Sequence, residues 1–165
     1  MLPYVVGIVL SIGVALFARW VGFDRDRAFY PAVLIVVASY YVLFAAMSGS
    51  VETVVVESAV MILFVIAAVA GFKRSAWIVV VGLAAHGVQD AFHGHIVANA
   101  GVPAWWPAWC LAYDVGAAAA LGWLLMRADL RVAQCERSSA RRTDPPACCV
   151  CKTCQYPPLV TTTCW

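Results

Sequence analysis

Two histidines and an aspartate at helical spacing are the residues of this chain best suited to chemistry. His86, Asp90 and His93 follow one another at i, i+4 and i+7 within the stretch AAHGVQDAFHGHIVANAG. At about 100° per residue, these side chains and that of Gln89 share one helix face, whereas His95 falls on the opposite face. Imidazole and carboxylate groups on adjacent turns can hold one metal ion, and histidine also titrates near neutral pH. The stretch therefore predicts a metal site or a proton site on one face of a helix.

The helix that carries these residues belongs to a chain for which lipid is the expected solvent. Of the 165 residues, 64% are hydrophobic and 12% are charged, whereas soluble domains are about half apolar and a quarter charged. Five runs are long enough to cross a bilayer as helices and too continuously apolar for barrel strands. They lie at 2–20, 31–47, 54–72, 76–97 and 106–126. We expect an all-α membrane protein, a polytopic bundle of about five transmembrane helices over residues 1–130.

Basic residues alternate between the loops that join these spans. They occur in the first and third loops and after the fifth span, as Arg19, Arg25, Arg27, Lys73, Arg74, Arg127 and Arg131. The loops SGSVET and ANAGVPAWWPAW hold none. Because short basic loops stay in the cytoplasm, we expect the N-terminus outside and the C-terminus inside. The expected location is the bilayer of a bacterial inner (plasma) membrane.

Two classes of assignment are disfavoured at this stage. The first span has no basic region before it, so we expect a membrane helix there and not a cleaved signal peptide. The net charge of +2 comes without a basic face, so the sequence predicts the lipid bilayer as partner and no nucleic acid.

Polar side chains from four spans all fall in the outer half of the bilayer in this topology. Counted at 1.5 Å per residue from the outer boundary, Glu57 and His93 lie about 5 Å deep, Asp90 and Asp114 about 10 Å, and His86 about 15 Å. Ionisable residues within spans usually face the interior of a bundle. We therefore predict an outward-facing site whose ligands are these five residues. Supporting polar side chains would be Gln89, Tyr40, Tyr41 and Tyr113.

Three functions are open for such a site. The first is binding of a divalent ion (zinc, iron, copper or manganese), which would extend to metal-dependent catalysis on a hydrophobic substrate. The second is a small proton-linked transporter or permeation subunit, although the cytoplasmic half of the spans offers no ionisable residue to complete a path. The third is a structural or accessory subunit whose polar layer only locks helix packing. The residue types favour metal binding, and the sequence leaves the reaction and substrate open.

The last part of the chain, residues 131–165, differs from the rest. It has no helical or strand periodicity and contains four prolines, so we expect a disordered cytoplasmic tail. Four of its thiols lie close together, which suits a zinc site, although the composition equally fits an unselected extension. They are Cys148, Cys149, Cys151 and Cys154.

Small residues recur at helical spacing in the fifth span. Gly116 is four residues before Ala120, and Gly122 follows Ala118 at the same interval. Small residues four apart let helix backbones approach closely in membranes. We expect these faces to pack helices together and to offer a surface for a homo-oligomer.

Overall fold

The described part of the chain is entirely helical. The computed structural model describes the backbone of residues 1–141 and the side chains of residues 1–131. It contains five α-helices and one short 3-10 helix, and no strand occurs in this part of the chain. The elements are α1 (Leu2–Val21), η1 (Phe23–Arg25), α2 (Phe29–Ser48), α3 (Val51–Lys73), α4 (Ala76–Ile96) and α5 (Trp106–Arg141). The all-helical prediction is confirmed for these residues.

Four of the helices are long and apolar enough to cross a membrane. They are α1, α2, α3 and the part of α5 over Trp106–Arg131. The helix α4 has nearly the bounds predicted for the fourth span, but it is not among these four. Its second half carries Gln89, Asp90 and three histidines, which lower its apolarity. The structure thus gives four apolar spans and a fifth helix of mixed character, where the sequence predicted five spans.

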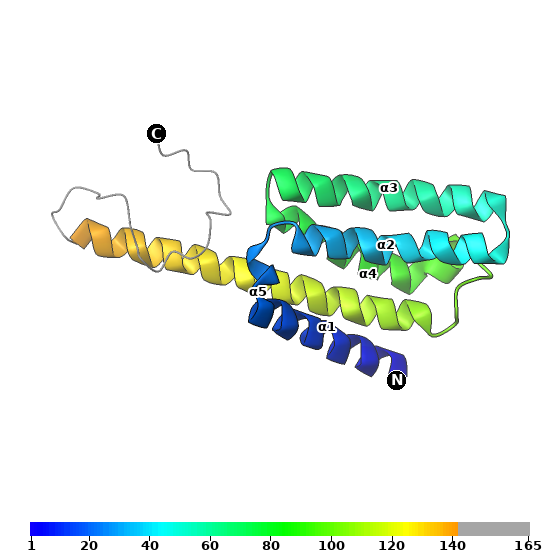
Figure 1. Cartoon of the computed structure of the whole chain (residues 1–165), viewed down its shortest axis with the longest axis horizontal. Coiled ribbons are helices and arrows are strands. Elements are labelled where there is room, and N and C mark those ends of the chain that lie inside the picture. The colour runs from blue at the N-terminus through cyan, green and yellow to red at the C-terminus, as the bar shows by residue number, and fades with distance from the viewer. Residues whose placement is uncertain (142–165) are drawn as a thin grey trace.

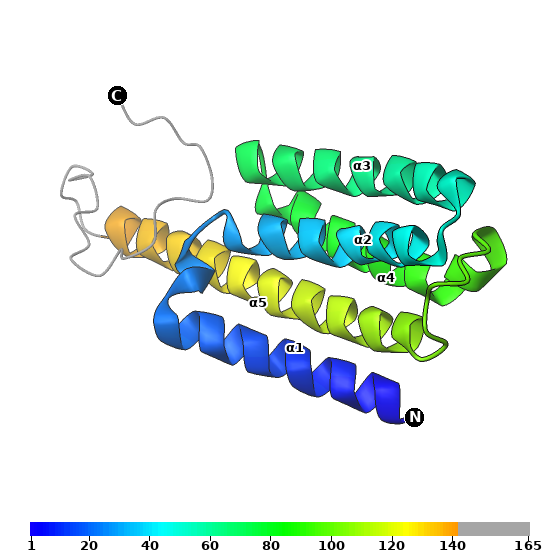
Figure 2. The same ribbon diagram turned by 45° about the vertical axis from the view of Figure 1, so that its right-hand side comes forward.

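One face of the mixed helix α4 packs against three other helices. It contacts α5, α3 and α2, whereas α1 packs on α5 and η1. Figures 1 and 2 show α1 and α3 at opposite edges, with α2, α4 and α5 between them. A helix with polar side chains is stable in an apolar medium when neighbouring helices cover those side chains. The three neighbours of α4 provide this cover.

Glycine and serine fix the turn between α2 and α3. The backbone at Gly49 has φ 75°, a left-handed conformation that glycine adopts without strain. Ser50 caps the next helix, because its hydroxyl oxygen accepts a hydrogen bond from the backbone N–H of Thr53 at 3.2 Å. This short turn keeps α2 and α3 antiparallel and side by side.

The small residues expected in the fifth span pack inside the chain. A Cβ atom at Gly116 would overlap the hydroxyl of Ser11 on α1, and one at Gly7 would overlap the backbone carbonyl of Trp109 on α5. Gly122 instead faces the side chains of Trp77 and Val80 on α4. Close packing is therefore present within one chain, and a homo-oligomer stays a prediction.

The buried side chains divide into an apolar half and a polar half. Large apolar residues fill the bundle toward η1 and the α3–α4 turn, among them Leu34, Val79, Leu83, Leu121 and Leu125. The buried ionisable residues lie toward the α2–α3 turn and the α4–α5 connection. They are Glu57, His86, Asp90, His93 and Asp114. This agrees with the placement in one half of the bilayer that was calculated from the sequence.

The helix α5 is longer than the sequence predicted. It continues to Arg141, past the boundary expected at residue 130, and its last turns project beyond the other helices (Figure 1). Arginine, alanine, leucine, glutamine and glutamate are good helix formers, so the helix persists after the apolar run ends. Residues 142–165, with Cys148, Cys149, Cys151 and Cys154, lie outside the described part, and the prediction for that tail stays a prediction.

Candidate metal centre

Four side chains from α4 and α5 form a buried group of metal-ligand types. His86 and Asp90 lie one turn apart on α4, and Cys110 and Asp114 lie one turn apart on α5. One ligand atom from each residue lies within 4.8 Å of the others, and all four residues are buried. Two i, i+4 pairs therefore face each other across the contact between the two helices.

A glycine lets these two helices approach at the level of the group. A Cβ atom at Gly87 would lie 3.3 Å from a methyl carbon of Leu111 and 3.6 Å from the Cβ of Asp114. A larger side chain there would push α5 away from α4. The residue that follows His86 thus helps to bring Asp114 within reach of its imidazole.

Hydrogen bonds hold part of the group in place. Nδ1 of His86 lies 2.5 Å from Oδ2 of Asp114 and 3.6 Å from Oδ2 of Asp90. The hydroxyl of Tyr41, on α2, donates to Oδ1 of Asp90 at 2.6 Å. The ring of Phe64, on α3, meets the imidazole of His86 edge to face, with centroids 4.9 Å apart. The group is therefore enclosed by four helices.

Three polar atoms of the group have no hydrogen-bond partner. They are Nε2 of His86, Oδ2 of Asp90 and Oδ1 of Asp114, and each is buried. A buried polar atom without a partner costs about 1–3 kcal/mol, more when it is charged. A group that served packing alone would be expected to satisfy these atoms. The unpartnered carboxylate oxygens leave the group able to accept a ligand of positive charge.

The separations of the donor atoms suit one small ion. In a tetrahedral zinc site with bonds of about 2.0–2.3 Å, neighbouring donor atoms lie about 3.3–3.7 Å apart. The 3.6 Å between His86 and Asp90 already falls in this range. The shortest separation, 2.5 Å, and the 4.8 Å limit of the group differ from it by about 1 Å. Side-chain rotation over such a distance needs no change in the helices.

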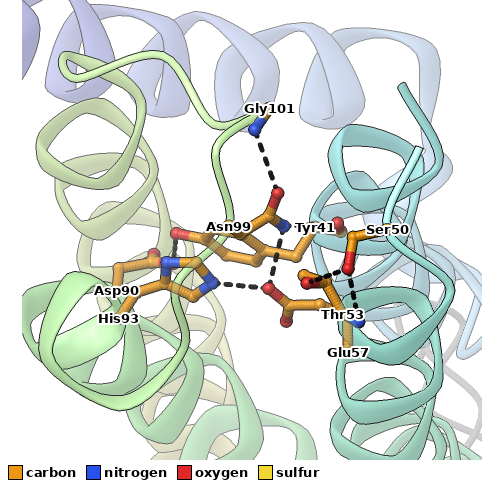
Figure 3. Close-up of polar contacts among 8 residues, drawn as sticks. All are labelled: Tyr41, Ser50, Thr53, Glu57, Asp90, His93, Asn99 and Gly101. Atoms are coloured by element: carbon orange, nitrogen blue, oxygen red, sulfur yellow. Dashed lines mark hydrogen bonds and ion pairs between the residues drawn. The ribbon is translucent and has the colours of Figure 1, made fainter. Parts of the chain in front are cut away.

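A second polar cluster lies farther along α4 (Figure 3). Nε2 of His93 is 2.8 Å from Oε1 of Glu57, and the Asn99 amide donates to the same oxygen at 2.9 Å. The Asn99 amide also donates to the backbone carbonyl of Tyr41 at 3.1 Å. The Tyr41 ring stacks on the imidazole of His93 with centroids 4.0 Å apart. Because its hydroxyl reaches Asp90, Tyr41 connects the two clusters.

The structure divides the five ligands predicted from the sequence between these two places. His86, Asp90 and Asp114 belong to the four-residue group, whereas His93 and Glu57 contact each other. Cys110 and Asn99 were missed by the sequence prediction. The sequence does contain a signal for Cys110. It stands four residues before Asp114, which is the same spacing as that of His86 and Asp90. Asn99 lies beyond the end of α4 and gives no periodic signal.

The supporting residues have different surroundings. Tyr41 is the only one of the four with a hydrogen bond from its side chain to the group, through Asp90. Gln89 is half-buried, and its Oε1 has no partner. Tyr40 packs on Trp106, and Tyr113 stacks on Trp109. His95 is exposed, as its opposite helical face predicted.

The described residues define a class of protein by fold and site. This class is a helical protein with four helices able to cross a membrane and a buried His, Asp, Cys and Asp group that can hold a metal ion. The chain matches no known protein family, no curated protein and no solved structure. The function therefore has to be argued from geometry and chemistry.

Proposed function

We propose that this protein is an integral membrane protein that binds one divalent metal ion at His86, Asp90, Cys110 and Asp114. The observation that carries the proposal is the convergence of four ligand atoms of three chemical types, all buried, within 4.8 Å. The unpartnered atoms of three of these residues add support. An ion bound by Oδ2 of Asp90 and Oδ1 of Asp114 would satisfy those two atoms, and Nδ1 of His86, not Nε2, lies toward the two carboxylates.

The donor types narrow the choice of ion. A thiolate favours zinc, iron or copper over manganese, magnesium and calcium, which prefer oxygen donors. One thiolate and two carboxylates carry three negative charges, against two positive charges on the ion. A buried thiolate is stable only beside such a charge, so metal binding would release the thiol proton of Cys110. Zinc and ferrous iron fit this mixed set best.

The number of ligands favours holding the ion over catalysis. Catalytic zinc sites usually keep three protein ligands and leave a fourth position for water or substrate. Here four protein side chains are within reach of one ion. Metal-dependent catalysis on a hydrophobic substrate would require one of them to leave, and the two carboxylates are the candidates because they exchange more readily than a thiolate.

The other two functions have less support. A packing role explains the His86–Asp114 and Tyr41–Asp90 contacts but leaves the three unpartnered atoms unexplained. A proton path across the bundle would need ionisable groups in both halves. In the described part of the chain, the half toward the α3–α4 turn is filled by apolar side chains.

Metal analysis of the purified protein tests the proposal. The full chain and a variant with serine at Cys148, Cys149, Cys151 and Cys154 are purified in detergent, because the tail thiols could bind metal themselves. We expect about one ion per chain in both proteins. His86→Ala and Asp114→Asn should lose it, whereas His93→Ala, a matched change at a buried histidine on the same helix, should retain it. Equal metal content in His86→Ala and His93→Ala would contradict the proposed ligand set.

The proposed orientation places the polar half toward the outside. Arg19 and Arg127 lie over the ring of Trp123, at 5.8 and 3.7 Å from its centroid, at the opposite end of the bundle. Basic and aromatic side chains together are typical of the cytoplasmic interface. Cysteines placed at two exposed alanines test this. A membrane-impermeant maleimide should label Ala104→Cys in intact cells and should label Ala28→Cys only after lysis. The reverse pattern would invert the topology.

A further inference from the structure

An open cavity lies at the end of the bundle where α4 stops. Its volume is about 480 Å³, and its wall is formed by the last turn of α4 and the connection to α5. Two polar side chains contribute to this wall, His93 and Asn99. Both of them contact the carboxylate of Glu57. The cavity therefore leads from the surface to two side chains that contact a buried acid.

Glu57 keeps one carboxylate oxygen without a partner. Its side chain is 1% exposed, and His93 and Asn99 both contact Oε1, so that Oε2 is unpartnered. A carboxylate accepts hydrogen bonds only, so the neutral imidazole of His93 carries its proton on Nε2 and keeps a lone pair on Nδ1. In metal sites a carboxylate that accepts from an imidazole in this way lies on the far side of the ring from the ion, so one ion binds both residues only when the His93–Glu57 hydrogen bond opens. Glu57 and His93 together suit a cation.

Tyr41 joins this cluster to the buried metal-ligand group. Its ring stacks on His93, and its hydroxyl donates to Asp90. His93 lies two turns beyond His86 on α4, which corresponds to about 10 Å along the helix axis. A cation at Glu57 would thus be separated from the buried group by one aromatic side chain, that of Tyr41.

The opposite half of the bundle offers no comparable approach among the described residues. Leu34, Val79, Leu83, Leu121 and Leu125 are buried there, and an ion cannot cross such a layer without losing its hydration. The polar half, by contrast, holds the buried carboxylates and histidines of the described part. An ion that reaches the buried group would come from the cavity side.

We propose that Glu57 and His93 form a second, weaker cation site, which receives a hydrated divalent transition-metal ion from the cavity before it passes to His86, Asp90, Cys110 and Asp114. As a route to that group, this inference rests on the proposed function. One carboxylate and one imidazole bind such an ion more weakly than the four buried ligands. The ion would complete its remaining coordination with water from the cavity. The outer site therefore governs the rate of metal uptake, and the buried group governs the final occupancy.

The rate of cobalt uptake tests this order of events. The full chain with serine at every cysteine except Cys110 is stripped with a chelator and mixed with Co²⁺. Loading of the buried group is followed by the charge-transfer absorption of a cobalt–thiolate bond at Cys110. Glu57→Gln should slow loading by at least about tenfold and leave the final absorption unchanged. Tenfold is the lower end of the effect that charged groups have on association rates. Glu52→Gln, an exposed carboxylate on the same helix, should load at the wild-type rate.

Two further outcomes separate this inference from the proposed function. In the double variant Cys110→Ala, Asp114→Asn, equilibrium dialysis should still detect one weakly bound Co²⁺, which Glu57→Gln then removes. Uptake by Glu57→Gln at the wild-type rate, or no weak ion in the double variant, overturns the inference even when the buried group fills. A weak ion without any charge-transfer absorption in the wild type overturns the proposed function and leaves the outer site standing. Should Glu57→Gln fail to purify as a single species, His93→Gln provides the same test.

Discussion

Replacing Cys110 by alanine tests whether its thiol is a metal ligand or only a small side chain of the core. Cys110 is fully buried and packs among the core residues of α5, so the substitution removes one buried sulfur. If the thiol only fills space, the cost is about 1 kcal/mol of unfolding free energy, comparable to one buried methylene group. That cost would be the same with and without metal. If the thiol is a ligand, most of the cost appears only when metal is present.

The size of the metal-dependent part can be estimated. At free zinc 1,000-fold above the dissociation constant, binding stabilises the wild type by about 4.1 kcal/mol. Loss of a residue that only supports a ligand weakens metal binding by up to about 100-fold. Removal of one of the four ligands themselves should therefore weaken binding by about 100-fold or more. The same zinc concentration then stabilises the variant by about 1.4 kcal/mol. The difference of about 2.7 kcal/mol corresponds to about 5–11 °C in melting temperature for a chain of this length.

Thermal unfolding in detergent measures this difference. The protein carries serine at the six tail cysteines, and its melting temperature is recorded with buffered free zinc and again with a chelator. The control is Ser11→Ala, a buried, small and polar side chain on α1 outside the metal-ligand group. Zinc should raise the melting temperature of this control as much as that of the wild type. An equal zinc-dependent rise in Cys110→Ala would refute the assignment of the thiol as a ligand.

Two further substitutions test the contacts that position the site. Tyr41→Phe removes the hydrogen bond to Asp90 and should lower the unfolding free energy of the metal-free protein by about 1–3 kcal/mol, because a buried carboxylate oxygen loses its partner. Tyr40→Phe should change it by less than about 0.5 kcal/mol, and equal losses in the two variants would mean that the bond to Asp90 contributes nothing. Gly7→Ala should destabilise the protein by about 1–3 kcal/mol in thermal unfolding, because the new Cβ would overlap the backbone of α5. The control Gly13→Ala faces open space and should be neutral or stabilising. A stable Gly7→Ala protein would show that α1 packs elsewhere.

The positions of the helices could be predicted from the sequence because each one coincides with an apolar run. The predicted fourth span, 76–97, and the helix Ala76–Ile96 nearly coincide, as do the other starts and ends within a few residues. The end of α5 could not be found in this way. Beyond residue 126 the helix continues through polar residues, where helix propensity and not hydrophobicity decides the boundary.

The site was predicted in part, and the reasons lie in the geometry of neighbouring helices. Angle and depth along α4 brought His86 and Asp90 together with Asp114, and the equal depth of His93 and Glu57 allowed their contact, but they could not show that this pair stands apart from the other three residues. Which neighbour faces which turn depends on how the helices pack, and one sequence does not contain this. Cys110 was missed because a single cysteine in an apolar run is usually a small hydrophobic side chain.

In the proposed membrane topology, the mixed character of α4 has a consequence for how the chain enters the bilayer during synthesis. An aspartate at the centre of a membrane helix opposes transfer from the translocation channel into lipid by about 2.5–3.5 kcal/mol, and α4 carries Asp90 with several histidines. Alone, α4 would partition poorly into lipid, whereas α2, α3 and α5 are apolar enough to enter lipid on their own. Release of α4 into the bilayer therefore has to wait until α5 has been synthesised and can cover its polar face. Substitutions that break the contacts between α4 and α5 would then first be seen as chains with α4 left outside the membrane.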